Sequence, residues 1–161
     1  MNRRALEGYE KCFGSDHPNT LMVVNNLALV LQDQGRYEGL EVMNRRALEG
    51  YEKCFGSVHP GTLMAVNNLA LVLRKQGRYE ESEVMNRRAL EGYEKCFGSD
   101  HPNTLTAANN LSMLLLKQRK FIESEILFRR VLEAREKVLG IDHTSVLSTI
   151  NNLTLALKSQ G

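Results

Sequence analysis

The sequence predicts an all-α protein made of repeated antiparallel helix hairpins, and three observations support this. First, a unit of 42 residues recurs, so that residues 1–42 and 43–84 differ at only seven positions. Second, each unit contains two segments with apolar residues at helical spacing. Third, one glycine separates these segments and another follows the second segment. Self-similarity at a fixed period of this length is typical of repeat architectures, in which each unit packs on the next.

The composition favours one domain spanning residues 1–161. Apolar residues make up 42% and charged residues 25% of the chain, and no apolar run reaches the roughly 20 residues that a membrane-spanning helix needs. The chain begins with MNRRALEGYEKC, which lacks the apolar segment of a secretory signal, so we expect a reducing, cytoplasmic location. The formal charge of +2 is nearly balanced and selects neither nucleic acid nor an anionic membrane as a partner.

The first helix of each repeat, named helix A here, is expected from His17–Pro18 to about Gln34 in the first complete copy. Proline suits the first turn of a helix because its missing N–H would have no intrahelical partner there. Apolar residues follow at helical spacing: Leu21, Val24, Leu27, Ala28 and Leu31. With Val23 and Val30 they cover more than half of the circumference, which predicts neighbouring helices on two sides.

The second helix, named helix B, is expected from about Tyr37 to Phe55. Gly35 ends helix A, and Gly56 stands at the C-terminal cap of helix B. The apolar residues of helix B again have helical spacing: Tyr37, Leu40, Met43, Ala47, Leu48, Tyr51, Cys54 and Phe55. The segment YEKCFG, which recurs in three copies, is therefore expected to be the end of a packing helix.

The repeat divides the chain into about eight helices. We expect a partial helix B in residues 1–14, hairpin units in residues 15–56, 57–98 and 99–140, and a final helix A in residues 141–161. Stacked hairpins of this kind contact only their neighbours, and the small rotation from one repeat to the next creates a superhelix with a concave surface.

One stretch of the sequence carries a family signature. Residues 67–98, NNLALVLRKQGRYEESEVMNRRALEGYEKCFG, resemble a tetratricopeptide repeat (TPR) through Leu69, Ala70, Leu73, Gly77, Tyr79, Ala89 and Leu90. The period of 42 rather than 34 residues, the Gly-x-Asp-His-Pro linker and the Asn-Asn-Leu-Ala helix are similar to the kinesin light chain type, also found in fungal signalling proteins with many near-identical copies. The resemblance implies a right-handed superhelical solenoid and protein or peptide binding.

Cysteines and histidines recur once per repeat, which raises the alternatives of a metal site or a nucleophile. Valine replaces cysteine in the fourth copy, and single residues from successive repeats do not converge as zinc ligands must. We therefore expect the cysteines to be buried packing residues and the histidines to make hydrogen bonds at helix starts. We expect no enzyme activity, catalytic residue, metal or cofactor. The residues concerned are Cys12, Cys54, Cys96 and Val138, with His17, His59, His101 and His143.

Paired arginines also recur on helix B, and such a ladder could contact nucleic-acid phosphates. However, a glutamate precedes the first arginine of three pairs by four residues, which is the favourable spacing for an ion pair within a helix. We therefore expect a solvated, charge-balanced face. The pairs are Arg3–Arg4, Arg45–Arg46, Arg87–Arg88 and Arg129–Arg130, and the glutamates are Glu41, Glu83 and Glu125.

The side of helix A opposite its buried residues is the candidate binding surface, and we name it the helix A stripe. In TPR proteins this side lines the concave groove, as the resemblance implies. An asparagine in mid-helix is a poor helix former, so its recurrence indicates a role in hydrogen bonding, either to the backbone of an extended peptide or between neighbouring helices. The predicted peptide-binding residues are Met22, Asn26, Leu29, Met64, Asn68, Leu71, Asn110, Met113, Asn152 and Leu155, with the basic residues Arg74, Lys75, Lys117 and Lys158.

Two functions of different classes remain open from the sequence. The first is a non-enzymatic binding module for a protein or peptide segment with acidic groups, without nucleic acid or membrane as partner. The second is a structural protein that stacks head to tail, the final helix A of one copy docking on the first helix B of another. An RNA-binding solenoid is a third, more remote alternative. Val42, Val84 and Ile126 add an apolar ladder on helix B that could contact another solenoid.

Overall fold

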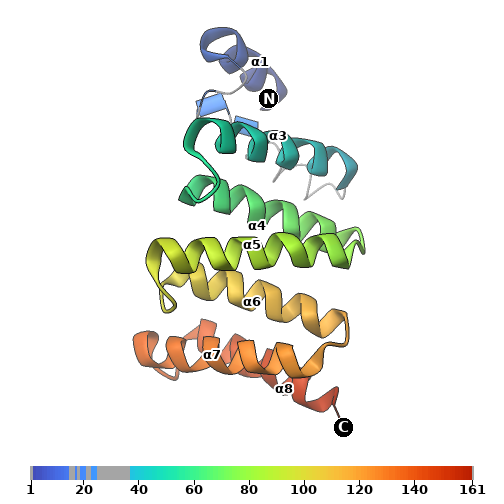
Figure 1. Cartoon of the computed structure of the whole chain (residues 1–161), viewed down its shortest axis with the longest axis vertical. Coiled ribbons are helices and arrows are strands. Elements are labelled where there is room, and N and C mark those ends of the chain that lie inside the picture. Colours follow the sequence, from blue (N-terminus) through green and yellow to red (C-terminus); the bar gives the residue numbers. More distant parts are fainter. Residues whose placement is uncertain (1, 15–16, 18, 21–22, 25–36, 161) are drawn as a thin grey trace. The chain divides into compact units, whose positions relative to one another are not determined.

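The computed structural model describes residues 2–14, 17, 19–20, 23–24 and 37–160. Every element in these ranges is an α-helix, as the sequence predicts (Figure 1). The helices are α1 (Asn2–Phe13), α3 (Tyr37–Phe55), α4 (Pro60–Lys75), α5 (Tyr79–Phe97), α6 (Pro102–Lys117), α7 (Phe121–Leu139) and α8 (Thr144–Lys158). The helix A expected from residue 17 to 34 falls largely outside the described residues.

The helix boundaries repeat with the period of the sequence. Helix α3 has the bounds expected for helix B, and α5 and α7 begin and end 42 and 84 residues later. Helices α4, α6 and α8 are the A helices, each starting directly after a histidine. The all-helical fold of TPR-like hairpins is thus confirmed.

The histidines cap the A helices, which confirms their expected role. The backbone N–H of Gly61 donates to Nδ1 of His59 at 3.1 Å, and the N–H of Asn103 donates to Nδ1 of His101 at 3.2 Å. The histidine therefore satisfies one of the N–H groups that have no partner at a helix start. The ring of His59 also stacks on Phe55, the last residue of α3, with centroids 4.5 Å apart.

The turn from helix B to helix A is fixed by a glycine and a threonine. Gly56 and Gly98 have φ values of +84° and +85°, a conformation that side chains with a Cβ rarely adopt. Thr62 Oγ1 donates to the carbonyl of Gly56 at 2.7 Å, and Thr104 Oγ1 donates to that of Gly98 at 2.8 Å. Both threonines are buried, so this hydrogen bond holds the start of one helix against the end of the preceding one.

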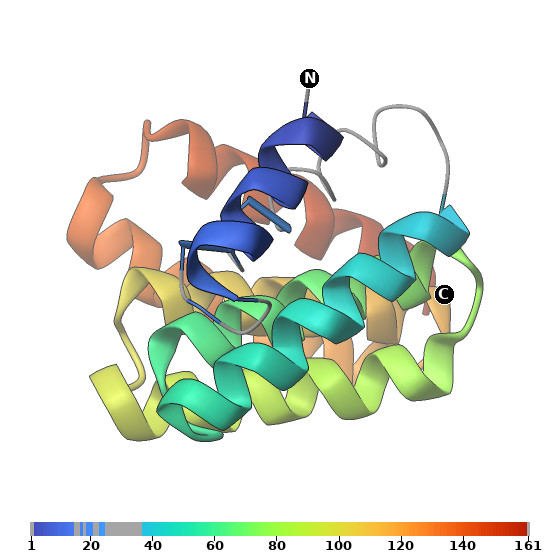
Figure 2. The same ribbon diagram turned by 90° about the horizontal axis from the view of Figure 1, so that it is seen from above.

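The chain forms two compact units, residues 1–85 and 86–161, and their boundary falls within α5. In the first unit α3 packs against α4, and the direction of the chain reverses between these two helices (Figure 2). In the second unit α7 packs against both α6 and α8. Phe128 of α7 is fully buried there beside Leu153 and Ala156 of α8.

On two B helices a serine stands at the repeat position of Leu40 and forms a buried hydrogen bond. Ser82 Oγ donates to the carbonyl of Ala70 at 2.7 Å, and Ser124 Oγ donates to the carbonyl of Ser112 at 2.8 Å. Each bond joins the two helices of one hairpin. A hydroxyl without such a partner would be costly to bury, so the bond explains why serine is accommodated at this position.

The turn between α6 and α7 contains a residue in the left-handed region. Arg119 has a φ of +62°, whereas its equivalent one repeat earlier is Gly77, with a φ of +78°. Replacing Arg119 by glycine is expected to stabilise the protein by about 0.5–1 kcal/mol, because glycine adopts this conformation without strain. Denaturant unfolding measures the difference. Gly77→Arg is the matched variant and should destabilise by a similar amount; a Gly77→Arg protein of unchanged stability would contradict this explanation.

Candidate functional site

The helix A stripe on α4 is accessible. The Met64 side chain is 42% exposed, and Lys75 at the end of the helix is also exposed. Asn68 and Leu71, which lie between them, are partly exposed. The opposite side of α4 is buried and supplies the core of the first unit: Leu63, Ala65, Val66, Leu69, Ala70, Val72 and Leu73. The stripe therefore offers an amide, apolar groups and a cation on one side of the helix.

The stripes on α6 and α8 have the same pattern. On α6, Asn110 and Met113 are partly exposed and Lys117 is exposed. On α8, Asn152 is partly exposed and Leu155 is 51% exposed. In each case an asparagine and an apolar residue share an accessible side. Three of the predicted binding residues, Met22, Asn26 and Leu29, lie outside the described residues.

The two asparagines of a pair differ in their surroundings on α6 and α8. On α6 the Oδ1 atom of Asn109 is buried, and no described residue donates a hydrogen bond to it. That oxygen is therefore closed to a ligand in this structure. On α8 the first asparagine, Asn151, is exposed, whereas the second, Asn152, is partly exposed.

The predicted cations differ in how far they can reach a ligand. Lys75, Lys117 and Lys158 are exposed at the ends of their helices. Arg74 is only partly exposed, and burial lowers the pKa of its guanidinium below the ordinary value, partly offset by Tyr79. The three lysines are thus the more available partners for an acidic ligand.

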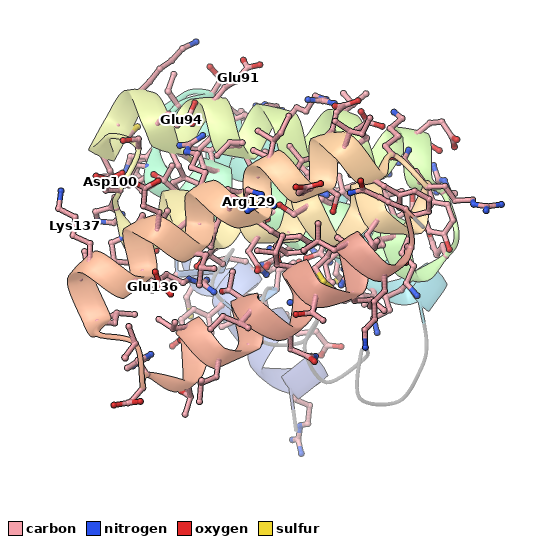
Figure 3. All side chains as sticks on the ribbon, turned by 90° about the horizontal axis from the view of Figure 1, so that it is seen from below. Glu91, Glu94, Asp100, Arg129, Glu136 and Lys137 are labelled. Atoms are coloured by element: carbon pink, nitrogen blue, oxygen red, sulfur yellow. The ribbon has the colours of Figure 1, made fainter. Side chains whose placement is uncertain are left out.

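Arginines of the pairs on the B helices form ion pairs, and those within α3 and α7 have the four-residue spacing that the sequence predicts. Glu41 and Arg45 pair within α3 at 2.8 Å. Others join successive B helices within each unit: Arg46 of α3 pairs with Glu10 of α1, Arg130 of α7 with Glu94 of α5 at 2.6 Å, and Arg87 of α5 with Glu123 of α7 at 2.9 Å. Figure 3 labels Glu94 on α5 and, on α7, Arg129, the residue that precedes Arg130. In these ion pairs, glutamates balance the charge of the arginines.

Glu41 has partners outside its own helix, which the sequence did not predict. Its carboxylate accepts hydrogen bonds from Gln76 at 2.9 Å and from Arg78 at 2.8 Å, besides Arg45. Burial raises the pKa of Glu41, but the hydrogen bonds from Gln76, Arg78 and Arg45 outweigh this and lower it below the ordinary value. The turn after α4 is thereby tied to the preceding helix B.

The cysteines correct one expectation. The sequence predicts that they are buried packing residues, but Cys12, Cys54 and Cys96 are all exposed. Phe55, next to Cys54, and Val138, which replaces the cysteine in the fourth repeat, are exposed as well. The last turn of helix B carries less packing than its centre, so the usual preference of cysteine for the interior does not apply there.

The described residues provide no evidence for a metal centre or a membrane-spanning element. Among them, no group of three or more histidine, cysteine, aspartate or glutamate side chains is placed to hold a metal ion. None of the described helices is both long enough and apolar enough to cross a membrane.

Solved structures share this fold over almost the whole chain. BtubC (BKLC) from P. vanneervenii superposes with a TM-score of 0.88 at 20% sequence identity, covering 99% of this chain and 64% of that one. A candidate kinesin light chain from Podosopora anserina with nearly identical TPR-like repeats superposes with a TM-score of 0.85 at 22% identity, and the crystal structure of a single-substitution variant of it with 0.87 at 21%. Each of these two comparisons covers 99% of this chain and 76% of the other. The present chain thus spans less than two thirds of the length of BtubC.

Sequence comparison identifies the family. No curated protein matches the chain closely enough to count as a relative. The tetratricopeptide repeat model, in contrast, matches residues 23–95 and 62–137, which together cover more than half of the sequence. Proteins with this fold generally mediate protein–protein interactions or act as scaffolds. With the helix boundaries, the capping histidines and the buried signature residues described above, the chain belongs to the tetratricopeptide repeat family.

Proposed function

We propose that this chain is a non-enzymatic interaction module that binds an extended peptide of another protein along the helix A stripe. The observation that carries the proposal is the accessible asparagine in the middle of each described A helix: Asn68, Asn110 and Asn152. An asparagine at such a position weakens the helix, and an amide used for binding accounts for that cost.

The chemistry of an asparagine amide suits a peptide backbone. Its NH₂ group donates and its carbonyl oxygen accepts hydrogen bonds, so it can pair with a backbone C=O or N–H whatever the side chain of that residue. Apolar residues beside it, such as Met64, Leu71 and Met113, provide contacts for peptide side chains. Affinity would therefore come from repeated backbone contacts, with selectivity from the surrounding side chains.

The exposed lysines favour acidic peptides. Lys75, Lys117 and Lys158 follow the asparagines on their helices and carry no compensating acidic residue in the last turn. A carboxylate on the ligand would gain a charge-assisted hydrogen bond there. We therefore propose a partner segment that combines acidic and apolar residues.

Selection from a peptide pool tests this function. Peptides with acidic and apolar residues should be enriched over neutral peptides of matched hydropathy, and the enrichment should fall as ionic strength rises. Equal recovery of acidic and neutral peptides would reject the proposed charge selectivity. A pool from which nothing is enriched would reject the peptide-binding function itself.

Self-assembly is a second candidate function, and the surface of α8 favours it. Leu147 is 52% exposed and Leu157 is 41% exposed, whereas the equivalent Leu105 and Leu115 of α6 are 4% and 0% exposed. Helix α7 packs on α6, and α1 shares the sequence ALEGYEKCF with the B helices α3 and α5. We infer that α1 of a second copy can cover the apolar side of α8 in a head-to-tail contact.

Sedimentation velocity at several protein concentrations tests this assembly. The chain is expected to form species larger than a dimer as concentration rises, because a head-to-tail contact does not close. Leu157→Glu should return it to a monomer by placing a charge in the contact. A monomer at every concentration would reject self-assembly and leave the peptide-binding proposal unaffected.

A further inference from the structure

A cavity of about 170 Å³ lies in the second unit, where the start of α6, the end of α7 and the start of α8 meet. Its lining includes Asp100, Leu105, Arg135, Val138, Leu139 and Ser145. Leucine and valine side chains form its apolar part, and Arg135 is the only cation in the wall. The cavity is too small for a folded partner or a length of peptide, but its size suits a single small chemical group.

The cavity lies where the fourth repeat departs from the earlier ones. Arg135 stands at the repeat position of Tyr51 and Tyr93, whose rings are buried. The ring of Tyr51 packs so closely against Gly61 that a methyl group added there would lie 3.2 Å from ring atoms. Asn103 stands at the position of Gly61 in the third repeat and Ser145 in the fourth. An arginine in place of the ring thus puts a positive charge in the wall of the cavity.

The charge of Arg135 has only neutral protein partners. Its Nη1 donates to Thr149 Oγ1 at 2.8 Å and to the carbonyl of Ser145 at 3.3 Å, and it forms no ion pair with any described carboxylate. The side chain is partly buried, and burial lowers the pKa of the guanidinium. A partly buried cation that still has N–H groups to donate favours an anion that offers two oxygen atoms.

Asp100 is the one acidic residue among the described residues of the wall, and its charge opposes the binding of an anion. Its carboxylate is exposed and accepts a hydrogen bond from Ser99 Oγ at 3.0 Å. Figure 3 shows it near the end of α7 that carries Glu136 and Lys137. Its negative charge repels an anion and so offsets part of the attraction that Arg135 exerts on it.

We propose that this cavity binds one carboxylate group, such as the side chain of an aspartate or glutamate, with Arg135 as its anchor. Thr106, which stands at the repeat position of Met64 in the helix A stripe, also lines the cavity, so a carboxylate bound there would lie at the edge of the stripe. The proposal does not rest on peptide binding along the stripe, because a small carboxylate alone should occupy the cavity. Its failure would leave the proposed function standing.

Titration with propionate at constant ionic strength tests the site. Propionate has the carboxylate end of a glutamate side chain. The readout is the guanidinium Nε–H signal of Arg135 in the ¹⁵N spectrum of the full chain. This signal is assigned by its loss in the Arg135→Tyr variant. We expect this signal to shift and to saturate at millimolar propionate, whereas propionamide, which has the same shape without the charge, should leave it unchanged.

The repeat itself supplies the matched variant. Arg135→Tyr restores the residue of the second and third repeats, so it should fold, and it should weaken propionate binding at least about tenfold, as followed by the backbone amides of Leu139 and Ser145. Asp100→Asn should strengthen binding about two- to fivefold by removing the repulsion. Arg129→Gln, on the exposed face of α7, should change nothing. The proposal is overturned if Arg135→Tyr binds propionate as well as the unmodified chain, if propionamide binds as tightly, or if Asp100→Asn abolishes binding.

Discussion

Replacing Phe128 by alanine is expected to destabilise the second unit by about 3–5 kcal/mol. The side chain is fully buried on α7, where it contacts Leu153 and Ala156 of α8. Partly buried side chains from α6 and α7 complete its surroundings: Met113, Leu116 and Leu132. Truncation to alanine would remove the transfer free energy of the ring and leave a cavity that three helices can fill only in part.

Urea unfolding, followed by circular dichroism, measures this cost. Ile122→Ala is the control on the same helix, because Ile122 is 70% exposed and its truncation should change stability by less than about 0.5 kcal/mol. A cost for Phe128→Ala below about 1 kcal/mol would mean that α7 and α8 do not depend on this contact.

Reversing the charge of Lys75 and Lys117 together is expected to weaken the binding of an acidic peptide at least about tenfold. Each lysine is exposed, so each reversal replaces an attraction of about 1 kcal/mol at 4 Å in water by a repulsion of similar size. The loss should shrink as salt is added, because exposed charges are screened. Fluorescence anisotropy with a peptide taken from the pool selection measures it.

Two exposed lysines on the B helices provide the control for this double variant. Lys95→Glu with Lys137→Glu changes the net charge by the same amount, but these residues lie outside the helix A stripe. Their reversal should weaken binding much less, through the long-range field alone. Equal losses in the two double variants would show that overall charge, and not the stripe, selects acidic ligands.

The fold was predictable because the sequence repeats. A period of 42 residues allowed one set of helix boundaries, Tyr37–Phe55 for helix B, to predict α5 and α7 as well. A glycine and a histidine stand at the same positions of each copy, and each has a local structural role: Gly56 adopts a positive φ, and His59 caps a helix. Local signals of this kind can be read from single residues.

Contacts between helices were less predictable. Asn44 and Asn86 lie outside the apolar positions of helix B, yet both are buried, and the equivalent residue Phe128 is buried too. Burial at this position follows from the neighbouring helices and not from the residue type. The ion pair of Arg46 with Glu10 likewise joins residues 36 positions apart, which helical spacing within one segment cannot predict.

The candidate surface was predictable only as a pattern. Helical periodicity placed Asn68 and Asn110 opposite the buried residues, where they are partly exposed. The cavity beside Arg135 could not be predicted in this way, because its wall is formed by residues of three different helices and of the turn before α6. A space between helices leaves no periodic signal in a sequence.

The central claim is that a peptide binds along the asparagines of the A helices. Its most direct test follows the side-chain NH₂ signals of Asn68 and Asn110 by NMR while a selected acidic peptide is added. Both signals should shift and saturate together with the anisotropy change, whereas the exposed Val42 and Val84 on the B helices should not respond. Unchanged asparagine signals with a saturating response at Val42 and Val84 would place the ligand on the B helices and contradict the claim.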